Sequence, residues 1–248
     1  MTIHVYPDKL QTGRVAADRA AQFMKATLDK QEKLRFIAAT GASQFDFLDH
    51  LCSLDGIDWD RTEMFHLDEY VGLDETHPAS FVGYLKRRLV NPVHPGLVHF
   101  INGKAPDQEA ERRRLSDLIS AAPIDVAFVG IGENGHLAFN DPPADFQTQE
   151  PYLVLNLDER CRAQQVGEGW FGSVGDVPPQ AYTMSVQQIL RSHRIICTVP
   201  DERKATAVRN CLGDDVEVTP EWPASILKTH NNCEVFLDET AASALERR

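Results

Sequence analysis

Two segments of the chain end a hydrophobic run in a cluster of acidic, histidine and glycine residues. They are residues 65–70, with the sequence FHLDEY, and residues 130–141, with the sequence GIGENGHLAFND. Each has the form of a buried strand that leads directly into side chains able to transfer protons. Because a strand end is rigid, such side chains are held in fixed geometry. The two segments together predict an active site assembled across a sheet.

The first segment places two acids, Asp68 and Glu69, next to each other. Adjacent side chains on extended backbone point to opposite sides, so we expect one acid to face a crevice and the other to bind a structural partner. A carboxylate in a dry crevice has its pKa raised toward the range that is useful for proton transfer. The alternative is a pair of solvated acids where a strand passes into a loop.

The second segment contains His136, preceded by Asn134 and Gly135 and followed by Asp141. A histidine here can be a general acid/base, a metal ligand or a hydrogen-bonded core group. A metal site would need further ligands at close spacing, and no second histidine or cysteine stands there, so we expect no metal. We expect Asp141 to orient His136, as a carboxylate orients the imidazole of a catalytic dyad.

Residues 40–43, with the sequence TGAS, are predicted to bind an anion. A strand that ends in glycine and serine before a helix exposes backbone N–H groups and a hydroxyl, which suit phosphate. The alternative is a tight turn with Ser43 as the helix N-cap. Lys204 stands at the start of another helix, where the macrodipole does not favour a cation. A bound anion explains this lysine better than its alternative, a solvated surface position.

Residues 161–171, with the sequence CRAQQVGEGWF, contain two glycines and two aromatic residues that we expect to be exposed. This composition predicts a mobile lid over a pocket. An irregular surface loop is the alternative.

Apolar runs and helical patterns alternate along the chain. Strands are predicted over 34–40, 62–67, 97–101, 124–130, 152–157, 194–199 and 234–237. Helices are predicted over 10–32, 78–90, 106–121, 201–212 and 223–228 and around Phe45–Leu54, and residues 159–191 mix helix and loop. The alternation predicts an α/β fold with a doubly wound, mostly parallel, Rossmann-like sheet and helices on both faces. Ligands bind beyond the carboxyl ends of such strands, where the polar segments converge.

The composition limits the class of protein. The 248 residues fit a single domain over 1–248, and the net charge of −12 argues against a nucleic-acid or membrane surface. It does not forbid an anionic small molecule, because a few cations can dominate one pocket. We see no signal peptide and no membrane span. The five cysteines are far apart, which favours a reducing cytoplasm.

Four pieces, in this order and spacing, resemble the glucosamine-6-phosphate deaminases, also called glucosamine-6-phosphate isomerases. They are LDEYVGL at 67–73, HPASF at 77–81, NGKAPD at 102–107 and GIGENGHLAFNDP at 130–142. The similarity covers most of the chain. A sister family, the 6-phosphogluconolactonases, shares the fold and a G-x-G-x-D-G-H core, but there T-A-S-L-F-P typically follows the histidine. The sequence LAFND at 137–141 therefore favours the deaminase branch.

The resemblance implies roles for the predicted residues. Asp68 resembles the base that moves a proton between C2 and C1 of the open-chain amino sugar, and His136 resembles the acid/base that opens the ring. Residues 40–43 and Lys204 resemble the phosphate anchor. The products would be fructose 6-phosphate and ammonia, without metal or organic cofactor. Asn134 and Asp141 are expected to be catalytic with Asp68 and His136. The remaining residues are expected to bind the substrate or its phosphate: Thr40, Gly41, Ala42, Ser43, Glu69, Gly135, Arg160, Arg162 and Gln165.

The chain departs from the family pattern in the phosphate loop and in the lid. The loop usually reads T-G-G-T/S-P, so Ala42 replaces a glycine, and a positive φ there would be costly. In the lid, well-known members of the family have an arginine that contacts phosphate. This chain lacks it, with Gln165 near its position, and Arg160 or Arg162 is the expected substitute. Basic residues that bind an activator in some members fall around 151–153, where this chain has none, so we expect no such activation.

Two further departures lie beside His136. Asn134 cannot serve as a carboxylate, and Asp141 is one methylene shorter than the family glutamate. Two rival functions therefore stay open: a lactone hydrolase that uses His136 as the base for water, and a non-catalytic sugar-phosphate sensor that Asp141 and Gln165 would favour. In each case the expected partner is a small sugar phosphate, and the sequence leaves a homo-oligomer open.

Overall fold

The computed structural model describes residues 1–245 and contains a seven-stranded sheet in which every neighbouring pair of strands is parallel. The strand order is β1-β10-β9-β6-β2-β3-β5. The strands are β1 (Thr2–Tyr6), β2 (Leu34–Ala38), β3 (Thr62–His66), β5 (Leu97–His99), β6 (Val126–Val129), β9 (Arg194–Val199) and β10 (Cys233–Asp238). The predicted α/β, mostly parallel fold is confirmed.

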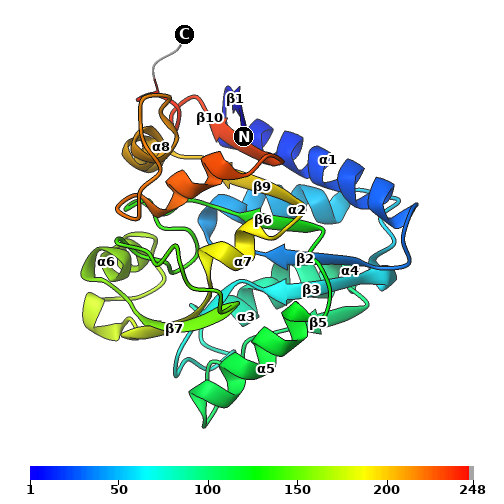
Figure 1. Ribbon diagram of the computed structural model, residues 1–248, viewed down its shortest axis with the longest axis horizontal. Helices are drawn as coiled ribbons and strands as arrows, with labels where there is room; N and C mark the ends of the chain where they lie inside the picture. Colours follow the sequence, from blue (N-terminus) through cyan, green and yellow to red (C-terminus); the bar gives the residue numbers. More distant parts are fainter. Residues whose placement is uncertain (246–248) are drawn as a thin grey trace.

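Helices cover both faces of this sheet (Figure 1). One face packs against α1 (Lys9–Leu28), α2 (Phe45–Ser53) and α3 (Phe81–Leu85), whose apolar side chains share one buried cluster. The other face packs against α5 (Gln108–Ser120), α7 (Val186–Leu190) and α8 (Ala205–Leu212). Coverage on both sides explains why strands such as β2 and β6 are buried along their whole length and read as continuous apolar runs.

A second sheet is antiparallel, with the order β4-β8-β7. Its strands are β4 (Asp68–Tyr70), β8 (Gln180–Met184) and β7 (Tyr152–Asn156). The predicted strand at 152–157 thus exists but pairs outside the parallel sheet. The prediction omitted β4 because it is short and acidic, β8 because it lies in the mixed stretch, and β1 because this edge strand is partly exposed. β4 follows β3 after one residue and carries both acids of the first motif.

Three predicted helices differ in detail from the observed ones. The helix predicted over 78–90 begins at Phe81, and its second half is a π-helical turn, η3 (Lys86–Val90), followed by α4 (Asn91–Val93). The helices predicted over 201–212 and 223–228 contain 3₁₀ turns. The 3₁₀ turns of the chain are η1 (Ala42–Gln44), η2 (Trp59–Arg61), η4 (Val174–Asp176), η5 (Glu202–Lys204) and η6 (Pro223–Thr229).

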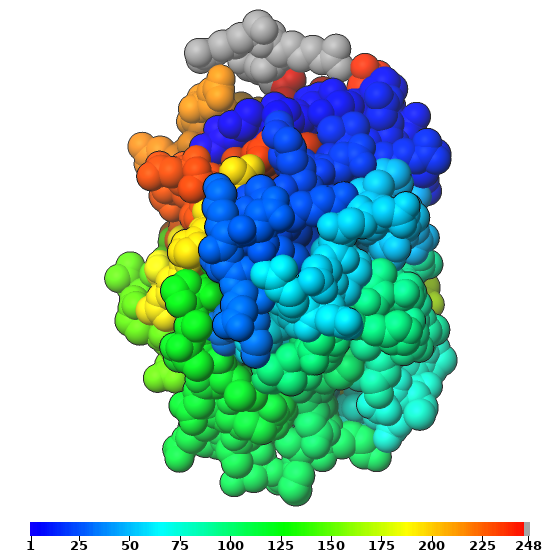
Figure 2. Space-filling view, turned by 90° about the vertical axis from the view of Figure 1, so that its right-hand side faces the viewer, coloured from blue at the N-terminus to red at the C-terminus, as the bar shows by residue number. Residues whose placement is uncertain are grey.

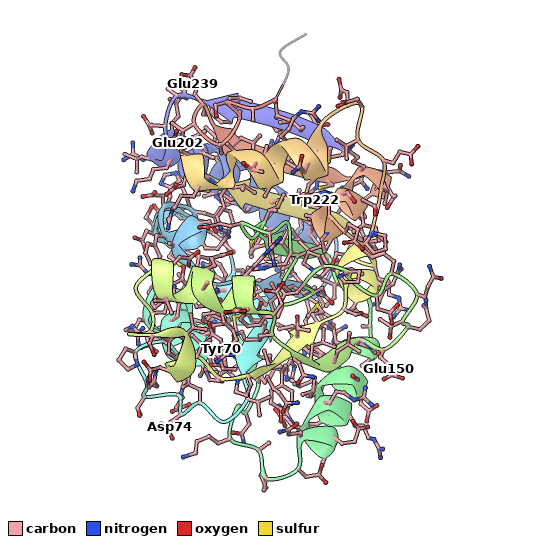
Figure 3. All side chains as sticks on the ribbon, turned by 90° about the vertical axis from the view of Figure 1, so that its left-hand side faces the viewer. Tyr70, Asp74, Glu150, Glu202, Trp222 and Glu239 are labelled. Carbon is pink, nitrogen blue, oxygen red and sulfur yellow. The ribbon has the colours of Figure 1, made fainter. Side chains whose placement is uncertain are left out.

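The remaining helix, α6 (Glu159–Gly167), lies at one side of the molecule, in front of the sheet in Figure 3. Figure 2 shows the other side, which the N-terminal segments (blue and cyan) and the green residues around α5 cover. The carboxyl ends of the strands thus meet α6, and the candidate site lies between them. No helix within 1–245 is both long enough and apolar enough to cross a membrane.

Gly13 permits the close packing of α1 on α2, and we expect Gly13→Ala to destabilise the protein. An added Cβ would lie 2.7 Å from Asp46 Cβ and 2.8 Å from Phe47 N. Relieving this overlap would cost about 1–3 kcal/mol of unfolding free energy. Urea denaturation measures the change, and Gln22→Ala, at an exposed position of the same helix, is the control. Equal stability of the two variants would contradict this packing.

Candidate active site

A pocket lies where the predicted polar segments converge, at the carboxyl ends of β2, β3, β6 and β9. Its empty volume is about 800 Å³, which includes the part open to solvent. It is lined by Lys9, Ala39, Thr40, Gly41, Ala42, Ser43, Leu67, Asp68, Phe81, Gly130, Ile131, Gly132, His136, Ala138, Phe139, Gln164, Gln165, Glu168, Pro200, Asp201, Arg203 and Lys204. The prediction that residues 40–43, Asp68, His136 and Lys204 lie close together in space is confirmed, because all of them line this pocket.

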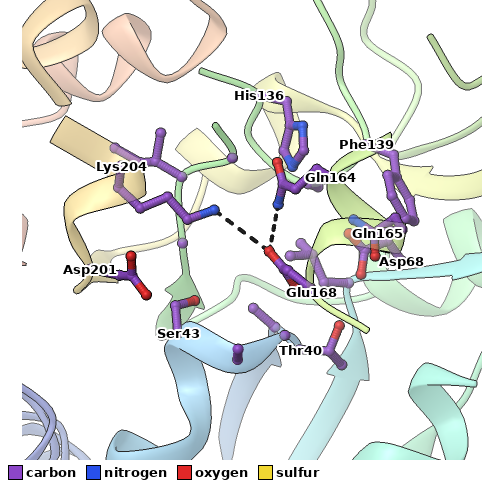
Figure 4. A pocket seen from close by; sticks show the side chains of 18 of the residues that line it. Thr40, Ser43, Asp68, His136, Phe139, Gln164, Gln165, Glu168, Asp201 and Lys204 are labelled. Atoms are coloured by element: carbon purple, nitrogen blue, oxygen red, sulfur yellow. Dashed lines mark hydrogen bonds and ion pairs between the residues drawn. The ribbon is translucent and has the colours of Figure 1, made fainter. Parts of the chain in front are cut away.

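The pocket has two chemically different ends (Figure 4). Lys204 and Ser43 lie on one side, and Asp68 lies with Phe139 on the opposite side. His136 reaches in from above the space between them. A ligand in this pocket would meet a cation and a hydroxyl at one end and a proton-transfer group at the other.

Asp68 and Glu69 point to opposite sides of β4, as predicted. Asp68 is 6% exposed, and its Oδ1 has no hydrogen-bond partner among residues 1–245. Burial, with a smaller contribution from the charge of Glu69, raises the pKa of Asp68 to about 8. Such a carboxyl can both release and accept a proton near neutral pH.

Glu69 does not line the pocket, and its inclusion among the substrate-binding residues was wrong. Its carboxylate accepts hydrogen bonds from Ser80 Oγ at 2.8 Å, Val82 N at 2.9 Å and Tyr70 N at 2.9 Å. It therefore satisfies backbone donors at the start of α3, which is a structural role. Successive side chains of β4 point to opposite faces of the strand, so Asp68 faces the pocket and Glu69 faces away from it.

His136 is held by Asp141 and Asn134. Its Nδ1 lies 3.2 Å from Asp141 Oδ1, and Asn134 Nδ2 donates to the same oxygen at 3.0 Å. Asp158 N donates to Asp141 Oδ2 at 3.1 Å. Burial alone would raise the pKa of Asp141, but interactions with His136, Asn134 and Asp158 outweigh it and lower the pKa. The shorter aspartate thus comes within 3.2 Å of the imidazole, but the geometry does not make a hydrogen bond, and the role of Asp141 in orienting His136 stays a prediction.

Asn134 and Asp141 do not line the pocket and both contact His136, so the geometry favours a positioning role over the predicted catalytic one. Asn134 Oδ1 also accepts from His136 N at 3.0 Å, which fixes the backbone of the motif. Gly135 likewise does not contact the pocket: it faces Trp222, where an added Cβ would lie 2.7 Å from the ring. Gly132 is the glycine that His136 requires, because a Cβ there would lie 2.2–2.4 Å from its imidazole atoms.

The phosphate loop departs from the family pattern without strain at Ala42. The positive φ falls on Gly41, at +96°, and Ala42 is not among the residues with positive φ. Gln44 stands where the family pattern T-G-G-T/S-P has its proline, and it stabilises the loop by hydrogen bonds. Its Nε2 donates to Ser43 Oγ at 3.1 Å, Thr198 O at 3.3 Å and Val129 O at 3.4 Å, and so links the loop to the ends of β9 and β6.

Lys204 reaches the pocket from the turn after β9. Asp201 has φ +93°, a conformation that is costly for a residue with a side chain, and its N–H donates to Asp238 Oδ2 at 3.1 Å. The Lys204 side chain is almost buried, and burial lowers its pKa, an effect that the charges of Glu168 and Glu133 partly offset. The strained residue Asp201 and the buried ammonium of Lys204 therefore lie at the same wall of the pocket.

Residues of the predicted lid line the pocket, namely Gln164, Gln165 and Glu168, and the mobility of this segment stays a prediction. Gln165 is buried and accepts a hydrogen bond from Tyr70 Oη at 2.7 Å. The expected exposure of the aromatic residues was wrong: Phe171 is 9% exposed and packs on Tyr70, and Trp170 is half-buried. Their packing anchors the segment after α6.

The two arginines expected to replace the family arginine do not line the pocket, so this expectation was wrong. Arg160 is exposed, and Arg162 Nη2 donates to Val174 O at 2.6 Å and Val177 O at 3.0 Å. Arg203 and Lys9 line the pocket instead. Sequence reasoning also missed Gln164 and Glu168 individually, although the glycines on both sides of Glu168 marked this stretch.

One group in the site has the composition of metal ligands. The ligand atoms of His136, Asp141 and Cys161 lie within 4.8 Å of one another. His136 and Asp141 already pair with each other, and burial raises the pKa of the Cys161 thiol, which opposes the thiolate that zinc binds. The pairing accounts for the proximity of these side chains without an ion.

The raised pKa of Asp68 predicts a pH-dependent loss of stability. Between its ordinary pKa near 3.8 and about 8, the folded state holds more protons than the unfolded state, so the unfolding free energy falls as pH rises. We expect the wild type to lose about 2–4 kcal/mol more than Asp68→Asn between pH 5 and pH 8.5. Denaturation at both pH values measures this loss. Asp55→Asn, at an exposed position, is the control, and parallel pH dependence of all three proteins would refute the shift.

Comparison with known proteins agrees with this architecture. The chain is 34% identical to a glucosamine-6-phosphate deaminase of Bacillus pumilus, over 98% of this chain and 99% of that protein. It is 37% identical to one from Staphylococcus epidermidis, over 82% and 84%. A solved monomeric glucosamine-6-phosphate deaminase superposes with a TM-score of 0.88 at 30% identity, over 98% of this chain and 100% of that one.

A more distant structure shares the fold alone. The 6-phosphogluconolactonase of Thermotoga maritima superposes with a TM-score of 0.78 at 16% identity, over 96% of this chain and 99% of that one. The family of glucosamine-6-phosphate isomerases/6-phosphogluconolactonase matches residues 7–236. The sequence match, the parallel sheet and the converging polar segments lead to one conclusion: the chain belongs to the glucosamine-6-phosphate isomerase/6-phosphogluconolactonase family.

Proposed function

We propose that the chain is an aminosugar-phosphate isomerase/deaminase that converts glucosamine 6-phosphate to fructose 6-phosphate and ammonia. The observation that carries this proposal is one pocket that brings together Asp68, His136 and a buried lysine, with Asp68 opposite the lysine and His136 between them. Relatives that are 33–37% identical and carry the deaminase name support it.

The substrate phosphate is proposed to bind at the end formed by residues 40–43 and Lys204. The first N–H groups of η1 have no partner within the turn, and Ser43 adds a hydroxyl. Binding energy from the phosphate, which does not react, positions C1 and C2 of the sugar at the other end.

His136 is proposed to open the sugar ring by transferring a proton to the ring oxygen. An imidazole that exchanges protons must keep one ring nitrogen toward the substrate. Asp141 Oδ1 lies 3.2 Å from Nδ1, and Gly132 lets the ring lie close against the backbone. The arrangement therefore leaves Nε2 for the sugar.

Asp68 is proposed to take the proton from C2 of the open-chain sugar and deliver it to C1. The resulting imine at C2 is hydrolysed by water, which releases ammonia and leaves the ketose. This step needs a carboxylate that binds a proton near neutral pH, and burial of Asp68 supplies that property.

Incubation of the purified protein with two substrates separates the candidate functions. Ammonia release from glucosamine 6-phosphate supports the proposal. Hydrolysis of 6-phosphogluconolactone without ammonia release would identify a lactone hydrolase. This alternative is tested because a 6-phosphogluconolactonase has the same fold. Tight binding of glucosamine 6-phosphate with no turnover would identify a sensor.

We also propose the cytoplasm as the location of this activity. All five cysteines are free, and four of them are buried. Unpaired cysteines in this number are typical of proteins from a reducing compartment.

Asp68→Asn tests the proton transfer. The variant should lose exchange of the C2 proton with solvent, and turnover should fall at least ~10²-fold, because an amide cannot accept that proton. Exchange is measured in deuterated water by NMR, and sugar-phosphate binding by calorimetry should stay within a few-fold of wild type. Asp55→Asn is the control. Exchange at the wild-type rate would remove Asp68 from this role.

Lys204→Ala tests the phosphate anchor. Loss of the ammonium should raise KM about 10–100-fold with a smaller effect on kcat, because it removes binding common to the ground and transition states. Lys33→Ala, at an exposed position, should behave as wild type. Steady-state kinetics of ammonia release give both constants, and an unchanged KM would exclude Lys204 from the anchor.

A further inference from the structure

The side chain of Glu168 lies inside the pocket, at the end where the phosphate is proposed to bind. Its Oε1 is 3.8 Å from Lys204 Nζ and accepts a hydrogen bond from Gln164 Nε2 at 2.8 Å. Its Oε2 accepts from Trp170 Nε1 at 3.1 Å. Figure 4 shows the carboxylate in the middle of the pocket, between Lys204 and Asp68. This position is unusual for an acid in a pocket that must bind an anion.

The contact between Glu168 and Lys204 is a charge pair and not a hydrogen bond, because 3.8 Å exceeds hydrogen-bonding distance. Both side chains are less than 10% exposed. Within residues 1–245, Lys204 Nζ has no hydrogen-bond acceptor, although an ammonium carries three donors. A phosphate, with several oxygens, would satisfy this buried cation better than the distant carboxylate does.

Glu168 and a phosphate cannot both stay beside Lys204. Two anions in a nearly dry pocket repel each other, and each disfavours the charged form of the other. Asp68 already places a further acid at the opposite end of the pocket. The incoming phosphate must therefore replace Glu168 as the partner of Lys204.

The chain around Glu168 permits this movement. Glu168 follows the last residue of α6 and lies between Gly167 and Gly169, both exposed. Gly169 has φ +82°, and an added Cβ on either glycine would meet no atom within 4 Å. The N–H groups of Glu168, Gly169 and Trp170 stay bonded to carbonyls of α6, and Phe171 fixes the segment beyond in a buried cluster. The open space beside the two glycines therefore leaves room for the Glu168 side chain to turn while the backbone stays in place.

We propose that Glu168 is an internal anion that occupies the phosphate subsite in the ligand-free protein and is displaced by the phosphate of the substrate. This inference rests on the proposed function, since it concerns the same subsite. Displacement lowers the apparent affinity for every anion, because only the fraction of molecules with Lys204 released can bind. A dianion interacts more strongly with Lys204 than a monoanion does, so a phosphorylated ligand is better able to displace Glu168.

Binding of inorganic phosphate to the full chain tests the displacement. Glu168→Gln removes the competing charge and keeps the size of the side chain, so it should bind phosphate about tenfold more tightly than wild type by calorimetry. Glu159→Gln, at an exposed position of α6, is the matched control and should bind as wild type does. Equal or weaker binding by Glu168→Gln would overturn the inference, since weaker binding would make Glu168 a ligand-binding group.

Trp170 gives a second measurement on the wild-type protein. Its indole N–H loses the Glu168 carboxylate when the carboxylate leaves, so phosphate should shift the tryptophan emission with the affinity found by calorimetry. Trp170→Phe should remove this shift and keep phosphate binding. Saturation by phosphate without a shift would overturn the inference, even if Glu168→Gln failed to fold. Absence of phosphate binding would also overturn it, whereas ammonia release tests the proposed function separately.

Discussion

The site depends on a carboxylate that the fold removes from water without fully satisfying it. Asp68 is buried at the end of a three-residue strand, and one of its oxygens has no partner among the described residues. Burial of this kind costs stability, because the charged form loses hydration that nothing replaces. The same burial raises the pKa of Asp68 to about 8 and so provides a group that exchanges protons near neutral pH. Stability and chemistry are therefore opposed at this one residue.

The neighbouring structure makes that burial possible. β4 belongs to the small antiparallel sheet, so Asp68 is held by pairing with Thr183 of β8 rather than by the parallel sheet. Glu69 remains tied to the start of α3. The short strand thus has one acid that fixes it and one acid that is left for chemistry. A longer or more flexible connection would let Asp68 turn toward water.

Charges of the pocket come from three separate parts of the chain. Asp68 comes from β4, Lys204 from the strained turn after β9, and Glu168 from the end of α6. Each is nearly buried, and the charge of Glu168 partly offsets the effect of burial on the pKa of Lys204. The pairing of Lys204 with Glu168 gives the buried ammonium an opposite charge within the ligand-free pocket. Ligand binding then amounts to an exchange of anions rather than to filling an empty cationic site.

Much of the fold followed from local patterns. Buried runs such as 34–40 and 124–130 must be covered on both faces, and their alternation with amphipathic helices leaves a doubly wound sheet as the natural arrangement. The convergence of Asp68, His136 and Lys204 followed as well, because parallel strands bring their carboxyl ends to one edge. The opposite directions of Asp68 and Glu69 followed from the alternation of extended backbone.

Other features depended on contacts between distant segments. The pairing of β4 with β8, the exposure of Arg160 and the burial of Phe171 each involve residues many positions apart. The reach of Asp141 to His136 depends on the turn between them and on Asn134. The sequence by itself determined which side chains meet at the sheet edge, because helices that alternate with strands make the strands parallel and bring their carboxyl ends to one edge. Only the tertiary structure decided which of them face the pocket and that Glu168 faces Lys204, because side-chain direction in loops and turns is set by packing.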